Sequence, residues 1–260
     1  MDYYHKYCKY KKKYLNLKIQ RGGYECADDE EITLMSKDKE IKVKCKIIKQ
    51  SGTITNLIED NKEKQSIPLP NIIGKILEKI ITILVQTDKE TLDEKRKIVS
   101  EILDKENLDF ETVKEIIIAS NYLDIKFLLD ACIEKYPRMI SEVKSVFAFD
   151  GMPPDIIRLL LPKININDLS IYENTDKLRF IIEFIENVDW DFQDAIKLSD
   201  NLKQYVTKVH GDINSETELA KMTNLQSLDA SWNYKITDVS VQKLTQLQKL
   251  DALGNYEITD

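Results

Sequence analysis

One stretch in the middle of the chain decides its fold: IIIASNYLDIKFLLD, residues 116–130. Apolar residues at helical spacing lie on both sides of a polar corner, so two helices should meet there. We expect Asn121 and Tyr122 to interrupt the first helix, which Asp109 can cap at its start, and Asp124 to cap the second. The upstream chain should pack on these helices, and the downstream chain should extend from them.

The corner has two interpretations. The side chains of Asn121 and Tyr122 can satisfy backbone groups locally, or they can be presented to another protein. Tyrosine offers a large, stiff surface with a polar tip, which protein interfaces favour. The residues by themselves leave both interpretations open.

The composition argues against several classes of function. Apolar residues make up 42% of the 260 residues, and the net charge of −7 argues against a general nucleic-acid surface. No apolar run is long enough for a transmembrane helix, so no membrane contact is expected. The cysteines and histidines lack metal-ligand spacing and a disulfide framework, so we expect no metal, no cofactor and a reducing compartment. They are Cys8, Cys26, Cys45, Cys132, His5 and His210.

Residues 1–30 form a Tyr/Lys-rich leader and an acidic linker. Tyr3, Tyr7, Tyr10 and Tyr14 line one face of a helix, which indicates a loosely packed leader helix; a basic aromatic arm for nucleic acid or a membrane surface is the alternative. No secretory signal is present, so we expect a cytoplasmic or nuclear protein. The leader resembles those of giant DNA virus proteins, and in that case the compartment is the host cell's.

A small sheet should follow the leader. Ile32–Met35 and the alternating residues 41–47 predict a hairpin with a buried face and an outer row of lysines. Residues 67–70, Ile-Pro-Leu-Pro, predict an edge strand or linker, since proline lacks an amide donor. Asn71 then has the position of a helix cap.

Helical spacing continues beyond the sheet. Residues 72–84 predict a core-facing helix, and Ser51-Gly52-Thr53 should start a shorter one through Ile58. The charge-dense residues 86–106 predict a solvated insertion with one weak helix near 98–103. Pro137 should close the helix that follows the corner.

Three stretches carry a resemblance to a known family. They are Lys49-Gln50-Ser51 with Thr53-Ile54 and Leu57-Ile58-Glu59-Asp60; Ile67-Pro68-Leu69-Pro70-Asn71; and Ala119 with Asn121-Tyr122-Leu123-Asp124-Ile125-Lys126 and Leu128-Leu129-Asp130. Their order and spacing resemble the S-phase-kinase-associated (Skp) adaptors of SCF ubiquitin ligases, which have a BTB/POZ fold. The resemblance implies an adaptor that bridges a cullin to an F-box protein.

The same resemblance implies a role for the corner. The family's A-x-N-Y-L-D-I-K motif contacts the cullin through its Asn-Tyr pair, which corresponds to Asn121 and Tyr122. The sequence departs from the family at two places. Residues 103–107, Leu-Asp-Lys-Glu-Asn, replace a Trp-Asp-x-x-Phe segment, and Phe127 replaces a small residue.

Residues 152–169, M-P-P-D-I-I-R-L-L-L-P-K-I-N-I-N-D-L, resemble an F-box. A rival alignment matches residues 151–161 to the adaptor's own tail helix. The F-box interpretation is preferred, and it implies that an apolar helical face packs on the adaptor's C-terminal helices, in cis or in another copy. That face is Ile156, Ile157, Leu160 and Leu161.

The last segment contains an internal repeat. The pattern L-x-x-L-D-A-x-x-N-Y-x-I-T-D begins at Leu225 and again at Leu247, an offset of 22 residues that lies in the leucine-rich-repeat range. The asparagine should satisfy backbone groups at each turn. Fewer than two repeats are present, so we expect this end to be truncated or to lean on the preceding helices.

The sequence therefore predicts an α+β chain with a BTB/POZ-like domain, a helical segment and a short leucine-rich-repeat stub. The expected divisions are 1–30, 31–140 (Skp-like BTB/POZ), 141–172 (F-box-like motif or adaptor tail helix), 173–213 (helical) and 214–260 (about two uncapped repeats). The expected function is a non-catalytic adaptor that joins a cullin to a degradation substrate. The alternative is a BTB/POZ interaction or oligomerisation module without a ligase role.

Overall fold

The computed structural model describes residues 26–60, 66–106, 108–145 and 148–259, so the expected leader, with Cys8 and His5, lies outside the described residues. The chain divides into two compact units. The first comprises the residues up to Met139 together with Gly151–Pro153, and the second comprises Ile140–Asp150 and Pro154–Asp260.

The first unit is built on a three-stranded sheet with the order β2-β1-β3 among the described residues. The strands β1 (Glu31–Met35) and β2 (Glu40–Lys44) form the expected antiparallel hairpin, and β3 (Ser66–Pro68) pairs with β1 in parallel at an edge, where its proline is tolerated. Ile32, Leu34 and Val43 are buried. The other face carries the exposed lysines that the alternating pattern predicted.

The second strand ends earlier than the alternation predicted. The expected strand reached Ile47, but Cys45–Ile48 form the short helix α2, and Cys45 and Ile48 are fully buried within it. A helical turn can bury consecutive residues, whereas a strand alternates. This turn starts the chain toward the next helix.

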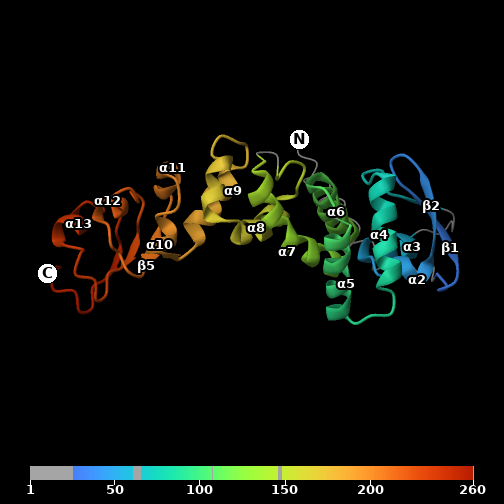
Figure 1. Ribbon diagram of the computed structural model, residues 1–260, viewed down its shortest axis with the longest axis horizontal. Coiled ribbons are helices and arrows are strands. Elements are labelled where there is room, and N and C mark those ends of the chain that lie inside the picture. The colour runs from blue at the N-terminus through green and yellow to red at the C-terminus, as the bar shows by residue number, and fades with distance from the viewer. Residues whose placement is uncertain (1–25, 61–65, 107, 146–147, 260) are drawn as a thin grey trace. The chain divides into compact units, whose positions relative to one another are not determined.

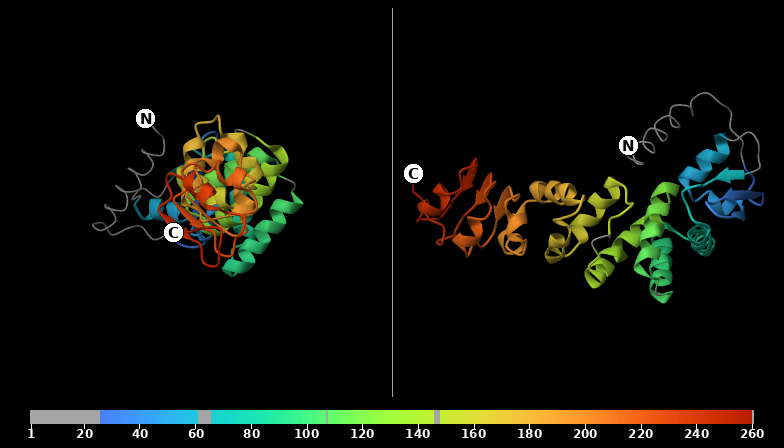
Figure 2. Two further views of the ribbon diagram at one scale, coloured as in Figure 1. Left: turned by 90° about the vertical axis from the view of Figure 1, so that its left-hand side faces the viewer. Right: turned by 90° about the horizontal axis from the view of Figure 1, so that it is seen from above.

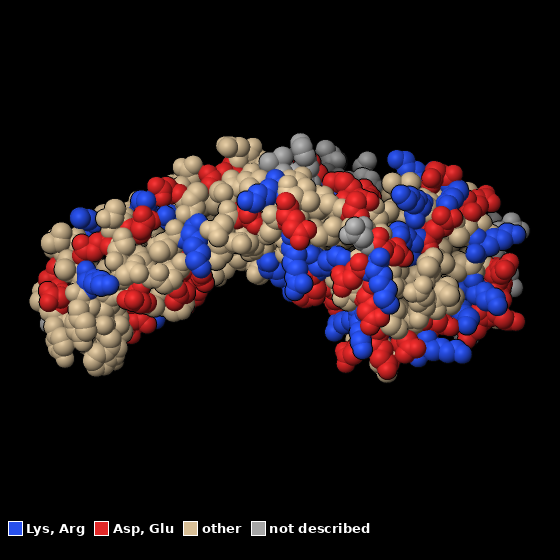
Figure 3. Space-filling model, viewed as in Figure 1, with Lys and Arg blue, Asp and Glu red and all other residues tan. Residues whose placement is uncertain are grey.

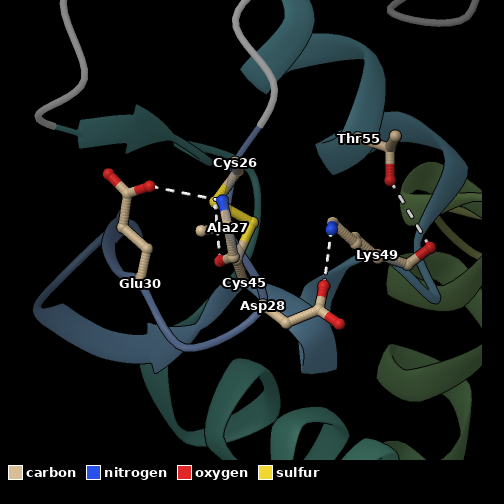
Figure 4. The surroundings of a disulfide bond; sticks show 7 residues. All are labelled: Cys26, Ala27, Asp28, Glu30, Cys45, Lys49 and Thr55. Atoms are coloured by element: carbon tan, nitrogen blue, oxygen red, sulfur yellow. Dashed lines mark hydrogen bonds and ion pairs between the residues drawn. A yellow bond between two sulfur atoms is a disulfide. The ribbon is translucent and has the colours of Figure 1, made fainter.

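The expectation that the cysteines are unpaired is wrong for Cys26 and Cys45, which form a disulfide (Figure 4). The residues are 19 positions apart, but the hairpin pairs Glu31 with Lys44 and so brings their neighbours together. The Cys45 amide donates to the Glu30 carbonyl (2.8 Å), and Lys49 Nζ lies 2.6 Å from Asp28 Oδ1. These contacts fasten the turn before β1 to α2.

Two helices follow in the expected places. They are α3 (Gly52–Asp60) and α4 (Gly74–Gln86), and α4 packs on β2, α2 and α6 (Figure 1). Asn71 does not cap α4: the Gly74 amide donates to Asp38 Oδ1 at 2.6 Å, and this bond lowers the pKa of the Asp38 carboxyl. The hairpin turn thus supplies the cap from a distance in sequence.

The charge-dense segment is better ordered than predicted. Helix α5 spans Leu92–Lys105 and begins with a capping box, in which Glu94 N donates to Thr91 Oγ1 and Thr91 N donates to Glu94 Oε2. Val99 and Leu103 are fully buried. Two apolar anchors and a cap outweigh the polar composition, because tertiary packing supplies most helix stability.

The last two helices of this region are α6 (Phe110–Leu123) and α7 (Lys126–Val143). Pro137 does not close α7 but lies inside it. Tyr136 and Ile140 on either side of the proline are fully buried. Their burial holds the helix beyond a residue that usually ends one.

The second unit starts with short helices. They are α8 (Pro154–Leu160), the 3₁₀ helices η1 (Leu161–Lys163) and η2 (Ile166–Tyr172), and α9 (Leu178–Asn187). Arg158 joins α8 to α9 through two bonds to the Glu183 carboxylate, of 2.9 and 3.0 Å, and these bonds lower the pKa of Glu183. Among the described residues, no helix is both long and apolar enough to cross a bilayer.

A parallel sheet begins where a helical segment was predicted. In the described part of this unit the order is β4-β5-β6-β7, with β4 (Trp190–Asp191), β5 (Lys208–His210), β6 (Ser227–Asp229) and β7 (Lys249–Asp251). The successive strands lie side by side (Figure 2, right). Short helices connect them: α10 (Phe192–Ala195), α11 (Asp200–Lys203), α12 (Glu216–Leu219) and α13 (Asp238–Gln242).

The repeated asparagine acts as the sequence predicts. Asn233 Nδ2 donates to the Ile213 carbonyl at 2.9 Å, and Asn255 Nδ2 donates to the Ile236 carbonyl at 3.2 Å. Each asparagine also accepts the amide two residues ahead through its Oδ1. The side chains are only 6% exposed, so they satisfy buried backbone groups that water reaches poorly.

Reduction of the Cys26–Cys45 bond should lower the free energy of unfolding of the first unit by about 3 kcal/mol, because the bond closes a short loop and restricts the unfolded chain. Urea unfolding followed by hydrogen exchange in β1 and β2, with and without dithiothreitol, measures the change. The Cys26→Ser, Cys45→Ser double variant should not respond to the reductant. Alkylation of Cys26 or Cys45 in the native, unreduced chain would contradict the bond.

Replacement of Asn233 by alanine should destabilise the second unit by about 1–3 kcal/mol, because it leaves the buried Ile213 carbonyl without its donor. Both tryptophans of the chain, Trp190 and Trp232, lie in this unit, so urea unfolding followed by tryptophan fluorescence reports on it. Asn224→Ala, at an exposed position, is the matched control. Equal unfolding midpoints for the two variants would refute the role of the asparagine.

Candidate partner-binding corner at the end of α6

Helix α6 continues through the expected interruption. Asn121 and Tyr122 lie in its last turn, and Asp124 ends it in the left-handed conformation (φ 54°, ψ 50°). The Asp124 amide donates to the Asn121 carbonyl (3.2 Å) and the Ile125 amide to the Ser120 carbonyl (2.9 Å). This bond pattern is the Schellman motif, which closes a helix at its C-terminus.

Asp124 therefore caps the helix before it, and the prediction that it caps the following helix is wrong. Ile125, not Asp124, precedes the first residue of α7, and its carbonyl accepts the Leu129 amide at 3.1 Å. Aspartate is one of the few residues other than glycine that enter the left-handed region readily, and this preference competes with its role as an N-cap.

The start of α3 completes the end of α6. Ser51 Oγ donates to the Leu123 carbonyl at 2.6 Å, and Thr53 Oγ1 donates to the Tyr122 carbonyl at 2.7 Å. Ser51 Oγ also accepts the Ile54 amide at 3.1 Å, so one hydroxyl serves both helix ends. Because the last carbonyls of a helix lack partners within it, these two hydroxyls fix the backbone of the corner.

Gly52 allows the two helices to approach. A β-carbon at this position would overlap the Asp124 carboxylate, and the Gly52 amide lies 3.4 Å from the Asp124 carbonyl oxygen. Any larger residue here would require the Asp124 side chain to move. The corner therefore depends on Ser51, Gly52 and Thr53 together.

The side chains of Asn121 and Tyr122 are both partly exposed. Their neighbours Ser120 and Leu123 are buried, at 0% and 1%. The helix thus turns its apolar face inward and leaves the two predicted contact residues within reach of another molecule. The phenol ring of Tyr122 is not sealed inside the protein.

Phe127 points into the protein rather than toward the corner surface. It is 6% exposed, and Lys95 Nζ lies 5.2 Å above its ring while it also bonds to Gln50 Oε1. Arg96, next to Lys95 on α5, pairs with Asp130 of α7 at 2.5 Å. The larger side chain at this departure from the family is accommodated beneath α5.

The predicted F-box-like residues lie in the second unit. Ile156, Ile157, Leu160 and Leu161 are between 0% and 1% exposed, in a region where α8 packs on α9 and η1. Leu159, on the other side of α8, is 52% exposed. The four predicted side chains are covered within the chain itself, so a second copy cannot reach them without a rearrangement.

Reactive groups do not gather at the corner. Cys132 is fully buried, and burial raises the pKa of its thiol to about 12, so it stays protonated near neutral pH. It packs in the core, as its helical spacing predicted. In the described ranges, no group of three or more potential ligand side chains could hold a metal ion.

Comparison with known proteins identifies a family for the chain. The family model described as "Skp1 family, tetramerisation domain" matches residues 30–87, from the start of β1 to just beyond α4. The chain is 37% identical over 131 residues to SKP1-like protein 11 of Arabidopsis thaliana, which covers 46% of this chain and 84% of that protein. This chain belongs to the Skp1 family.

Other members of the Skp1 family match over similar or longer stretches. The "E3 ubiquitin ligase complex SCF subunit sconC" of Talaromyces stipitatus is 31% identical over 168 residues, which covers 60% of this chain and 98% of that protein. The "SCF ubiquitin ligase complex protein SKP1a" of Dictyostelium discoideum is 35% identical over 127 residues, which covers 43% of this chain and 78% of that protein. The α+β, BTB/POZ-like character expected from the sequence is confirmed for the first unit.

Sequence reasoning missed the residues that support the corner. The tripeptide Ser51-Gly52-Thr53 was predicted to start α3, which it does, but the bond from Ser51 to Leu123 joins positions 72 residues apart. The tripeptide gives no local signal for these contacts, because their partners Leu123 and Tyr122 lie far away in the sequence.

Ser51→Ala should lower the free energy of unfolding of the first unit by about 1–3 kcal/mol, because the buried Leu123 carbonyl and the Ile54 amide lose their hydrogen-bond partner. Hydrogen exchange of residues 119–126 should quicken, since the turn loses its support. Ser100→Ala, at an exposed position of α5, is the control. Unchanged exchange in 119–126 would show that Ser51 does not hold the corner.

Proposed function

We propose that this chain is a non-catalytic adaptor of a cullin-RING ubiquitin ligase of the SCF type. The support is its membership of the Skp1 family together with the names of its relatives, several of which are SCF subunits. In this role the chain joins a cullin to the protein marked for degradation, and a partner supplies the catalysis. The proposal includes a location in the cytoplasm or nucleus.

The cullin contact is assigned to Asn121 and Tyr122. The observation that carries the assignment is a pair of partly exposed side chains on a backbone that α3 holds rigidly through Ser51 and Thr53. A contact residue whose backbone is already fixed loses little conformational entropy on binding. Tyrosine is also among the residues enriched at binding hot spots.

The second unit would recruit the substrate. The parallel coils with their asparagine bonds support a leucine-rich-repeat array, in which β4 and β5 add two coils to the two repeats seen in the sequence. Residues 152–169 remain assigned to an F-box-like segment, with the adaptor's own tail helix as the rival. Either assignment needs Ile157 and Leu160 on the inner side of α8, where their burial supports it.

A second candidate is a POZ module for self-association without a ligase role. The description of the matching family model as a tetramerisation domain favours it. Size measurement of the chain with and without a cullin fragment separates the candidates. An adaptor forms a mixed complex, whereas a self-association module forms only its own oligomers.

The decisive variant is Asn121→Lys with Tyr122→Lys. Two positive charges on long side chains at the corner should reduce the amount of cullin captured by about tenfold or more, because truncation or replacement of hot-spot residues costs at least that much. Gln86→Lys with Ser100→Lys adds the same charge at exposed positions of α4 and α5 and should capture cullin normally.

Both double variants should unfold at the temperature of the parent chain, which excludes misfolding as the cause. Cullin capture by the Asn121→Lys, Tyr122→Lys variant at the level of the parent would reject the proposed contact.

A further inference from the structure

An aromatic surface lies on the coils of β6 and β7 in the second unit. Four side chains in the turns that follow these strands are 55–77% exposed: Trp232, Tyr234, Leu253 and Tyr256, here named the aromatic edge. Figure 3 shows a broad area without charge at the lower left, where the residues coloured red in Figure 1 lie. Large exposed rings gathered in one place are a frequent sign of a binding surface.

The rings are held in fixed positions. Trp232 has a left-handed backbone (φ 58°), its amide donates to the Leu253 carbonyl at 2.8 Å, and its indole covers Gly254, where a β-carbon would overlap the ring. Tyr234 and Tyr256 stack with their centroids 6.1 Å apart and their planes 14° apart. A surface arranged before binding needs little further ordering.

Two carboxylates adjoin the aromatic edge. Asp229 and Asp251 end neighbouring strands in register, and Ser231 bridges them: its amide donates to Asp229 Oδ1 and its hydroxyl to Asp251 Oδ1, both at 3.0 Å. Leu253 N also donates to Asp251 Oδ1. Hydrogen bonding from Ser231 lowers the pKa of Asp229. The bonds from Ser231 and Leu253 to Asp251 are both made at its Oδ1.

The charges are unequal on the two sides of the sheet. Strand starts carry Lys208 and Lys249 beside Asp189, and the charges of His210 and Lys249 also reach the Asp229 carboxyl and help to lower its pKa. Strand ends and the turns beyond them carry mainly acids, with Lys235 and the imidazole of His210 as the exceptions: Asp191, Asp212, Asp229, Asp251 and Glu257. The aromatic edge therefore lies on the acidic side of the sheet, which complements a positively charged partner.

We propose that the aromatic edge binds an extended peptide segment that carries arginine. The guanidinium stacks on the outer face of Trp232 and donates to Asp229 and Asp251, while Tyr234, Leu253 and Tyr256 cover the apolar part of the segment. Arginine fits better than lysine, because its planar group both stacks on rings and bonds to two oxygens in a fork. This inference rests on the proposed function, since it specifies the chemistry of the recruited substrate.

Fluorescence anisotropy of a labelled, unstructured Gly/Ser peptide with arginines, titrated with the full chain, tests the proposal. The citrulline version of the peptide, which keeps the shape and removes the charge, and the glutamate version should both bind at least about tenfold more weakly. Asp251→Asn and Tyr256→Ala should each weaken binding of the arginine peptide by about three- to tenfold, and Trp232→Ala should weaken it by about tenfold or more.

The controls separate binding from folding. Tyr256 is 77% exposed and Asp251→Asn keeps its acceptor Oδ1, so neither variant should unfold the coils even if Trp232→Ala does. Val239→Ala removes an equally exposed apolar side chain of α13, outside the aromatic edge, and should bind the peptide normally.

Equal binding of the arginine and glutamate peptides, or unchanged binding by Asp251→Asn, would overturn the proposal. Self-association that Tyr256→Ala abolishes, without peptide binding, would overturn it as well and would make the edge a contact between copies. Asp251→Asn should still capture cullin like the parent chain. Peptide binding by a chain that captures no cullin would refute the adaptor role and leave the arginine site standing.

Discussion

The first unit depends on one constraint: the last carbonyl groups of α6 have no hydrogen-bond partner within their own helix. The end of α6 lies beside buried residues such as Leu123 and Ile125, so water cannot supply hydrogen bonds to its last carbonyl groups. Ser51 and Thr53 supply the missing donors from the start of another helix. The two helices consequently fix each other, and the side chains of Asn121 and Tyr122 are held on a backbone that has no local freedom.

Side chains from distant segments perform the same task elsewhere in the chain. Asp38 in a hairpin turn caps α4, and Asn233 and Asn255 satisfy carbonyls one coil away. In the second unit the device is repeated from coil to coil, so that each coil needs its predecessor. The repeated sequence motif continues a sheet that begins at Trp190, so strands rather than the expected helices precede it.

The features that could be predicted were those with a periodic pattern of neighbouring residues in the sequence. The alternation of residues 41–47 predicted the hairpin, although β2 ends at Lys44, and the spacing of apolar residues predicted α4 and α6. The missed features depend on tertiary contacts: α5 needs the burial of Val99 and Leu103, and the disulfide needs the hairpin register. Strands β4 and β5 were missed because they are only two and three residues long and each has a single buried side chain, Trp190 or Val209.

The difference between local sequence patterns and tertiary contacts also applies to the candidate site. The assignment of Asn121 and Tyr122 as contact residues stays a prediction. Asp124 was assigned to the wrong helix, because the choice between a Schellman turn and an N-cap depends on which carbonyls lie nearby. The support from Ser51 and Gly52 could not be foreseen, since it joins segments separated by about a quarter of the chain.

Pro137 has a consequence for how the chain folds. A proline inside a helix lacks the amide that would pass the hydrogen-bond pattern onward, so propagation from Lys126 halts before it, and nucleating a new turn beyond it is unfavourable for a short segment. The turns from Arg138 to Val143 therefore become helical only when the side chain of Ile140 packs in its buried position. This stretch of α7 forms as a result of tertiary packing and does not initiate it.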